Sequence, residues 1–371
     1  MRIMHTADWH IGKNLAGFDL AEDQDAVFEK LVETAKKEHV DAIIIAGDLY
    51  DRANPSEDSV DRVNRMLYRL NREEGFPLLV VSGNHDSGVR LGTGQQWYES
   101  TNLYMRTELK DAFTPIELED TQFFLLPYFE PFAARDYFKD DSLTNINKAM
   151  PPVVEKMQKQ FAPDKRHILV GHFFAAGSKH SDSETLVNVG GLDAVAVSDL
   201  QAFDYVALGH LHNRHALDDP KVQYSGSLLK FSVSEAVQEK GVYIIDTDTM
   251  QRRFVSLAPL HDLQQVTGSF ARFADPTNFS AEELDAYTAV KLTDVEVIPN
   301  VMAKLRQVFP RLIELKRETH VDLGEVAHTD VKLAPTKLLG DFFQQVTGSE
   351  LSEQQMEWAK AALANAGEEK K

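Results

Sequence analysis

Short apolar runs that end in polar clusters recur five times along this chain. Each run is rich in β-branched and other apolar residues, and each is bounded by glycine or polar residues. Runs of this length without alternation are typical of strands buried on both faces. The runs cover residues 2–7, 42–47, 78–83, 167–171 and 205–209. We therefore predict five buried strands, each followed by a polar turn.

Helical periodicity fills the intervals between the first three runs. Apolar residues recur at helical spacing over 20–39, and again from Ser56, a plausible N-cap, to about Arg72. We expect the second helix to bury Val60, Val63, Leu67 and Leu70. Strands that alternate with helices in this way predict an α/β fold with a mostly parallel sheet.

The rest of the chain predicts a second sheet, a small module and a helical tail. Residues 222–227 and 241–246 predict further strands of a second, more antiparallel sheet. Beyond Pro259, strands over 261–273, 289–292 and 311–317, with a helix over 299–308, predict a small α+β module. Two amphipathic helices follow Pro335. We expect domains over 1–258, 259–334 and 335–371.

Composition narrows the class of protein. The chain has 371 residues, no cysteine and a net charge of −19. No thiolate chemistry is possible, and no apolar stretch approaches the roughly 20 residues of a membrane span. The first strand starts so early that we expect no signal peptide and a cytoplasmic protein. The charge argues against a generic nucleic-acid coat. It leaves a nuclease open, because clustered carboxylates hold divalent cations that meet phosphates.

The polar clusters contain metal ligands. Asp, His and Asn in one site suit Mn, Fe or Zn, and two ions about 3.5–4 Å apart need a bridging carboxylate. Asp48 is the natural bridge, because its strand is central and Gly47 allows close approach. One ion would take Asp8, His10 and one late histidine. The other would take Asn84, His172 and the remaining late histidine, and the spacing leaves open which of His210 and His212 serves which ion.

Each cluster also has a structural interpretation. Asp8-Trp9-His10 alone is more typical of a turn or cap, and a lone His172 more typical of a structural histidine. Recurrence at five strand ends favours ligands. His5, His39, His261, His320 and His328 lie outside the clusters, and we expect them to be structural.

The order of these motifs resembles the calcineurin-like metallophosphoesterase superfamily. The set is Asp8-x-His10, Gly47-Asp48-x-x-Asp51, Gly83-Asn84-His85-Asp86, Gly171-His172 and Gly209-His210-x-His212. Three further stretches, 47–56, 181–184 and 224–235, are similar to the SbcD family of exonuclease subunits. The resemblance implies a four-layer αββα metallophosphoesterase sandwich with a small capping domain and a C-terminal helical tail.

The same resemblance implies roles for individual residues. The first metal would be bound by Asp8, His10, Asp48 and His212. The second would be bound by Asp48, Asn84, His172 and His210. Mn²⁺ is the metal that the family uses. His85 would lie beside the scissile phosphate and protonate the leaving oxygen, although a purely orienting role is the alternative.

The implied activity is hydrolysis of DNA. An SbcD-like chain would be an ATP-dependent double-strand exonuclease and single-strand endonuclease that acts on DNA ends and hairpins. It would work as a homodimer with the SbcC ATPase, which must supply the ATPase site because the chain has no Gly-x-x-x-x-Gly-Lys-Ser/Thr loop. We expect 56–72 and 88–100 to form the dimer surface, where Met66, Tyr68, Trp97 and Tyr98 offer apolar side chains, and the alternative is that these four side chains are buried in the core. The tail would dock on SbcC or pack on its own core.

Two other functions fit the same motifs. One is a scaffold subunit with a vestigial nuclease site, which the intact ligand set argues against. The other is a small-molecule phosphodiesterase or protein phosphatase, which would not need the tail after Pro335.

Overall fold

Two sheets form the centre of the computed structural model, which describes residues 1–179, 181–183, 194–318 and 335–368. The first sheet has the order β13-β12-β1-β4-β5-β6, and the second has the order β11-β10-β9-β8-β7. The strands of the first sheet are β1 (Arg2–Thr6), β4 (Ala42–Ala46), β5 (Leu78–Val81), β6 (Leu103–Arg106), β12 (Gly241–Asp246) and β13 (Arg252–Ser256). Those of the second are β7 (Ile116–Leu118), β8 (Thr121–Leu126), β9 (Arg166–His172), β10 (Tyr205–Gly209) and β11 (Val222–Tyr224).

Helices cover both outer faces. The helices of the main body are α1 (Ala21–Lys37), α2 (Glu57–Tyr68), α3 (Gly88–Leu91), α4 (Gln95–Tyr98), α5 (Pro131–Phe138) and α6 (Ile146–Gln158). A π-helical turn, η1 (Arg69–Glu73), prolongs α2, and the 3-10 turns there are η2 (Glu99–Thr101), η3 (Leu109–Phe113), η4 (Val197–Leu200) and η5 (Val233–Glu235). A small hairpin, β2 (Asn14–Leu15) with β3 (Phe18–Asp19), precedes α1.

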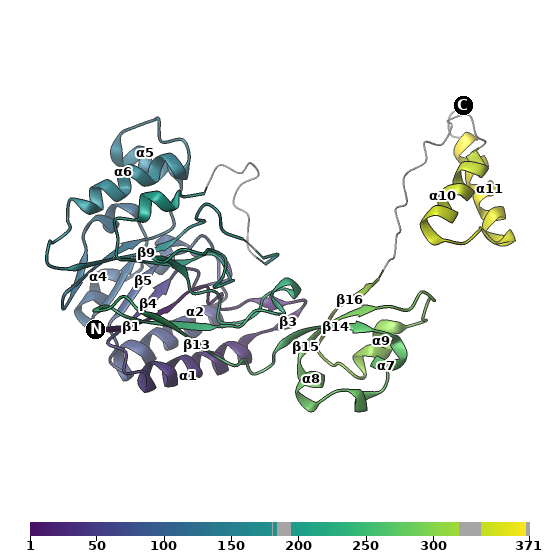
Figure 1. The fold of residues 1–371 in the computed structure, drawn as a ribbon, viewed down its shortest axis with the longest axis horizontal. Helices are drawn as coiled ribbons and strands as arrows, with labels where there is room; N and C mark the ends of the chain where they lie inside the picture. The colour runs from purple at the N-terminus through teal and green to yellow at the C-terminus, as the bar shows by residue number, and fades with distance from the viewer. Residues whose placement is uncertain (180, 184–193, 319–334, 369–371) are drawn as a thin grey trace.

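Alternation along the strands produces four layers. Ile43 and Ile45 of β4 join the core under α1 and α2, whereas Ile44 joins the core shared with the second sheet. On the far side, Leu169 of β9 packs with residues of α5 and α6. Successive side chains of a strand point to opposite faces, so strands buried on both faces hold two layers together. The result is the predicted αββα sandwich, with α1 and α2 on one side and α5 and α6 on the other (Figure 1).

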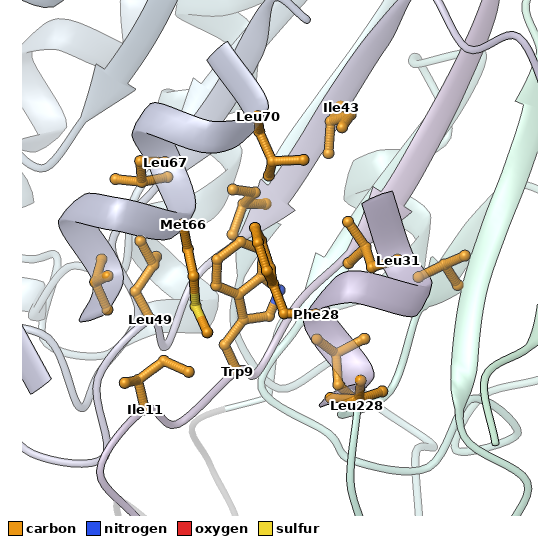
Figure 2. Close-up of a cluster of buried hydrophobic side chains, with 14 of the residues drawn as sticks. Trp9, Ile11, Phe28, Leu31, Ile43, Leu49, Met66, Leu67, Leu70 and Leu228 are labelled. Carbon is orange, nitrogen blue, oxygen red and sulfur yellow. The ribbon is translucent and has the colours of Figure 1, made fainter. Parts of the chain in front are cut away.

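Trp9 anchors the first loop of the site to the helix-side core. It is 2% exposed and lies at the centre of a cluster that residues of α1 and α2 surround (Figure 2). Its ring meets Phe28 edge to face, with centroids 5.9 Å apart, and its Nε1 donates to Thr6 Oγ1 at 3.0 Å. An aromatic ring with its polar atom satisfied is a rigid buried anchor. The loop carrying Asp8 and His10 is therefore fixed by the residue between them.

Three expectations about the fold are wrong. Strand β12 pairs antiparallel with β1 in the first sheet, while β11 joins the second sheet parallel to β10, so the second sheet is mostly parallel. Val60 is 38% exposed, because α2 turns its buried face toward Val63 and Leu67. The stretch 261–273 is not one strand but β14 (Leu263–Gly268) followed by α7 (Phe270–Phe273).

A second, smaller body follows β13. Its parallel sheet has the order β14-β15-β16, with β15 (Tyr287–Leu292) and β16 (Leu312–Arg317). The intervening turns and helices are η6 (Pro276–Asn278), α8 (Ala281–Asp285) and α9 (Val301–Arg306). Two further helices, α10 (Pro335–Thr347) and α11 (Glu353–Glu368), are drawn as a pair set apart from the rest (Figure 1). None of the helices in the described residues is long and apolar enough to span a bilayer.

Candidate metal centre

The site lies where the carboxyl ends of both sheets meet. Asp8 follows β1 and Asp48 follows β4, whereas His172 ends β9 and His210 follows β10. The backbone N–H of His210 donates to Asp8 Oδ1 at 2.9 Å, across a sequence separation of 202 residues. His172 Nδ1 donates to the carbonyl of Ala46, also from sheet to sheet, at 2.8 Å. Sites at strand carboxyl ends are typical of α/β sheets, and here two sheets share one.

The backbone turns unusually at four predicted ligands. Asp8, His10, Asp48 and His210 have φ values of 52°, 46°, 51° and 97°. Each non-glycine residue in this region costs about 1–3 kcal/mol, so the surrounding contacts must hold it there. Part of that support is visible, because the N–H of Asp8 donates to the Gly47 carbonyl and the N–H of His10 to the Asp48 carbonyl. Strain of this kind concentrates at functional sites.

Glycines let the loops approach one another. A Cβ on Gly83 would lie 2.1 Å from Asp48 Oδ1, and one on Gly47 would lie 2.3 Å from the His172 ring. Gly47 also has a φ of +88°, which other residues rarely adopt. The expectation that Gly47 allows close approach at Asp48 agrees with this geometry.

The first group of donors is formed by Asp8, His10 and His212. Ligand atoms of these three buried residues lie within 4.8 Å of one another. His10 Nε2 faces His212 Nε2 at 3.1 Å, and Asp48 Oδ2 lies 3.7 Å from His10 Nε2. Two imidazole nitrogens at that separation match two ligands of one ion, since a metal–nitrogen bond is about 2.1 Å. The His212 partner of this group is the one that the family resemblance implied.

The second group of donors centres on Asn84. Its Oδ1 lies 3.0 Å from His172 Nε2 and 2.9 Å from His210 Nδ1. Asp48 Oδ2 lies 3.3 Å from the same His172 nitrogen. Asp48 therefore reaches both groups, as a bridging carboxylate must.

His85 lies beside Asp48 and His10 but is held differently. Its N–H donates to Asp48 Oδ1 at 2.8 Å, and its ring Nδ1 donates to the carbonyl of Asp51 at 2.7 Å. With Nδ1 occupied in this way, Nε2 is the nitrogen that can serve a substrate. The ring is partly exposed and meets His10 edge to face at 4.8 Å.

The electrostatics of the site depend on its burial. Burial raises the pKa of Asp8 to about 6 against the opposing effect of His172 and His212. Burial would also raise the pKa of Asp48, but His172 and His10 outweigh it and hold that pKa well below its usual range. For His172, burial opposes the charge, yet Asp48 and Asp8 raise the pKa to about 9. Burial lowers the pKa of His210 to about 3.

The donor set fits divalent cations. In the part of the chain that the structure describes, the ion pairs of Asp8 and Asp48 are with histidines alone. Two buried carboxylates without a Lys or Arg partner are costly unless a cation pairs with them. Oxygen and imidazole donors together suit Mn, Fe or Zn. The seven predicted ligands are thus brought together in two adjoining groups, and His85 lies beside them.

Sequence reasoning missed several residues that hold the site. Asp86 accepts the N–H groups of Leu49, Tyr50 and Gly83, so it ties two loops together. Burial and the neighbouring Asp48 raise its pKa to about 7. Its place in the Asn-His-Asp motif was a signal that could have identified it.

Asp51 and Glu235 also lie at the site, and sequence reasoning assigned neither of them a role there. Asp51 pairs with Lys13 Nζ at 2.7 Å and forms a third donor group with His10 and His85. Glu235 is fully buried beside His212, at 3.4 Å from its Nδ1. Both lie in motifs that carried the resemblance, but spacing alone assigned them no role.

Comparisons with known proteins give matches along nearly the whole chain. Residues 1–214 match the family described as calcineurin-like phosphoesterase. Residues 259–347 match the family described as type 5 capsule protein repressor C-terminal domain. The SbcD subunit of the nuclease SbcCD from Staphylococcus epidermidis is 34% identical over 368 residues, which are 98% of each chain.

The solved structures that match the chain are less similar in sequence. A dimetal phosphatase from Danio rerio is 12% identical, with a TM-score of 0.42, and the match covers 70% of this chain and 99% of that one. An archaeal phosphodiesterase is 14% identical, with a TM-score of 0.32, over 69% of this chain and 100% of that one.

Proposed function

The chain belongs to the calcineurin-like phosphoesterase family and, along nearly its whole length, to the SbcD family, and on this basis we propose that it is the nuclease subunit of an SbcCD-type complex. It hydrolyses DNA phosphodiester bonds with two divalent ions, Mn²⁺ in our proposal. The observation that supports this best is the meeting of two donor groups at Asp48. A site for a single ion would not need that arrangement.

The residues of the chain have separate tasks in this mechanism. The first ion would be held by Asp8, His10, Asp48 and His212, and the second by Asp48, Asn84, His172 and His210. When bound, the ions would supply charge neutralisation at the phosphate and a more acidic water. The strained loops around Asp8 and Asp48 keep the donors in place before the ions arrive, which saves reorganisation during the reaction.

His85 is proposed as the catalytic residue that is not a ligand. The Asp51 carbonyl fixes its tautomer, with the proton on Nδ1. In the doubly protonated ring, the second proton, on Nε2, can pass to the leaving oxygen, and the neutral ring that remains keeps its Nδ1 proton on the Asp51 carbonyl. Because the backbone N–H of His85 donates to Asp48 Oδ1, the main chain of His85 is fixed relative to the proposed bridge.

The partners follow from the same proposal. DNA ends, hairpins and single strands are the substrates, and an SbcC ATPase supplies the ATP dependence. The exposed side chains of α10 and α11 favour docking of the tail: Leu338 is 47% exposed, Phe342 62% and Trp358 64%. Unburied apolar residues on short amphipathic helices suit a groove on a partner. We assign residues 1–258 to the nuclease domain, 259–334 to the capping domain and 335–371 to the helical tail that binds SbcC. We also propose that the protein is cytoplasmic.

A homodimer is the second part of the assembly. Trp97 is 80% exposed, Val89 81% and Tyr68 59%, so α2, α3 and α4 present an apolar surface. Met66, which we expected there, is instead 3% exposed and packs in the core with Trp9 (Figure 2). Aromatic residues are enriched at the centres of interfaces. A chain that sediments only as a monomer at micromolar concentration would contradict this surface.

A cleavage assay tests the proposed activity against its alternatives. The full chain with Mn²⁺ should degrade single-stranded DNA, and with SbcC and ATP it should shorten linear duplex DNA. Cleavage of a simple phosphodiester ester without cleavage of DNA would favour a small-molecule enzyme. No cleavage of either substrate, despite bound Mn²⁺, would favour a scaffold.

A further inference from the structure

A buried ion pair lies directly behind the ligand His212. Glu235, in η5, is fully buried, and Lys240, just before β12, is 6% exposed. Lys240 Nζ lies 2.6 Å from Glu235 Oε2. Burial opposes ionisation of Glu235, but Lys240 and His212 hold its pKa well below the usual range. A wholly buried pair is weak evidence for stability, because desolvation offsets the attraction of the charges. Another role must be sought in what the pair touches.

The pair contacts both the ring and the backbone of His212. Glu235 Oε1 lies 3.4 Å from His212 Nδ1, and Ser183 Oγ, which donates to the same carboxylate oxygen, lies 2.8 Å from that nitrogen. Lys240 Nζ donates to the His212 carbonyl at 2.8 Å and to Ser227 Oγ at 2.9 Å. Ser227 returns its N–H to the same carbonyl at 3.2 Å. The main chain and the imidazole are thus fixed from two sides.

The contact at Nδ1 decides which nitrogen faces the ion. A carboxylate accepts and cannot donate, so the proton of a neutral His212 ring is held on Nδ1. Its Nε2 then presents a lone pair toward His10 Nε2, 3.1 Å away. The other proposed imidazole ligands have simpler supports: His172 Nδ1 uses the Ala46 carbonyl, while His210 Nδ1 itself faces Asn84. His10 Nδ1 also lies near a carboxylate, that of Asp51 at 3.8 Å, whereas the carboxylate beside His212 Nδ1 is closer, at 3.4 Å, and fully buried.

We propose that Glu235, braced by Lys240 and Ser183, is a positioning residue that sets the tautomer and orientation of His212 for the first ion. The proposal rests on the two-ion function proposed above. Carboxylates that orient a metal-bound histidine raise its basicity, and removing one typically weakens metal binding about 10–100-fold. Within the described residues, the side chain of Glu235 has polar contacts with Ser183, His212, Ser232 and Lys240 and with no residue of the second donor group, so its effect should be confined to one ion.

The test compares Glu235→Gln with Glu239→Gln in the full chain. Glu239 provides a matched control, because it is exposed and pairs with Arg214 rather than with a ligand, and its substitution removes the same charge. Calorimetric titration with Mn²⁺ should resolve two sites in the unmodified chain. In Glu235→Gln the site containing His212 should bind about 10–100-fold more weakly, while the other site is unchanged. Glu239→Gln should bind both ions normally.

A spectroscopic measurement separates positioning from a merely structural role. Long-range ¹H–¹⁵N correlation on histidine-labelled, metal-free protein reports which ring nitrogen of His212 carries the proton. That proton should be on Nδ1 in the unmodified chain and in Glu239→Gln, and should be shared between the nitrogens in Glu235→Gln. Ser183→Ala, which changes no charge, should give a smaller shift of the same kind because Glu235 remains near Nδ1.

The outcomes distinguish this inference from the function on which it rests. If the unmodified chain binds fewer than two Mn²⁺ ions, the proposed function fails. If it binds two, and Glu235→Gln binds both with unchanged affinity and an unchanged His212 tautomer, only the positioning role is overturned. If Glu235→Gln does not fold because it leaves Lys240 unpaired, the double variant Glu235→Gln/Lys240→Met, which removes both charges, decides by the same two measurements.

Discussion

Replacing Asp48 should abolish binding of both ions, whereas replacing Asp8 should weaken mainly one. Asp48 Oδ2 lies 3.7 Å from His10 Nε2 and 3.3 Å from His172 Nε2, one nitrogen from each donor group. Asp8 instead shares its group with His10 and His212. Asp48→Ala should therefore remove the only carboxylate that both proposed sites share.

The size of the effect follows from linkage. An ion that binds only the folded chain stabilises it by about 2.7 kcal/mol at a concentration one hundred times its Kd. Two ions would contribute about 5 kcal/mol, which corresponds to a rise in Tm of about 10–20 °C for a domain of this size. Asp8→Ala should keep about half of that rise, and Asp48→Ala almost none.

The assay combines Mn²⁺ titration calorimetry with thermal unfolding in EDTA and in excess Mn²⁺. Asp48→Asn serves as the shape-matched control, because its amide oxygen can still accept the N–H of His85 and keep the loop in place. Compared with Asp48→Ala, Asp48→Asn should recover more of the thermal stability in EDTA than of the Mn²⁺ binding. Two-site binding that survives in Asp48→Ala would refute the bridging assignment.

Three other predictions test separate parts of the molecule. His85→Gln should leave Mn²⁺ binding nearly intact and lower turnover by about 10²–10⁴-fold; a loss of metal in calorimetry would make His85 a ligand instead. Truncation after Pro335 should abolish co-purification with SbcC but spare Mn²⁺-dependent cleavage of single-stranded DNA, and an unfolded truncated chain would return the tail to the core. Burial lowers the pKa of His5 in the native chain to about 3. Below pH 6.5, the ordinary pKa of histidine, the unfolded chain therefore binds a proton that the native chain does not, and the free energy of unfolding falls as the pH drops. His5→Gln should remove about 1.4 kcal/mol per pH unit of this loss between pH 6.5 and 5, as measured by urea unfolding in EDTA. If the free energy of unfolding depends on pH equally in the variant and the unmodified chain, His5 is charged in the native state.

The strand ends and the fold class could be predicted because they depend on local pattern. Buried strands and the polar residues that follow them are adjacent in sequence, so a run such as 42–47 and its Asp48 are visible together. The αββα sandwich followed from the family resemblance, and the structure and the family match agree with it. The ligand assignments themselves are compatible with the observed distances and stay predictions until an ion is titrated.

Strand pairing and side-chain direction could not be predicted in the same way. The pairing of β12 with β1 joins residues more than two hundred positions apart, and no local period specifies a partner at that range. Val60 and Met66 both fit an amphipathic helix, but the packing around Trp9 decides that Met66 is buried and Val60 is not. Glu235 lay in a motif that was noticed, yet its contact with His212 exists only in three dimensions.

The sharing of one site between two sheets has a consequence for how the chain folds. Asp8 meets the N–H of His210 across 202 residues, and His172 meets Asn84 across 88. Closing such long loops costs conformational entropy before the contacts can form and stabilise the chain. These contacts should therefore form late in folding. An amino-terminal fragment ending after β6 would contain only the donors of the first sheet and could not bind an ion with the full ligand set. On a ribosome, the chain would therefore acquire its metal affinity only after the strands of both sheets have emerged and docked.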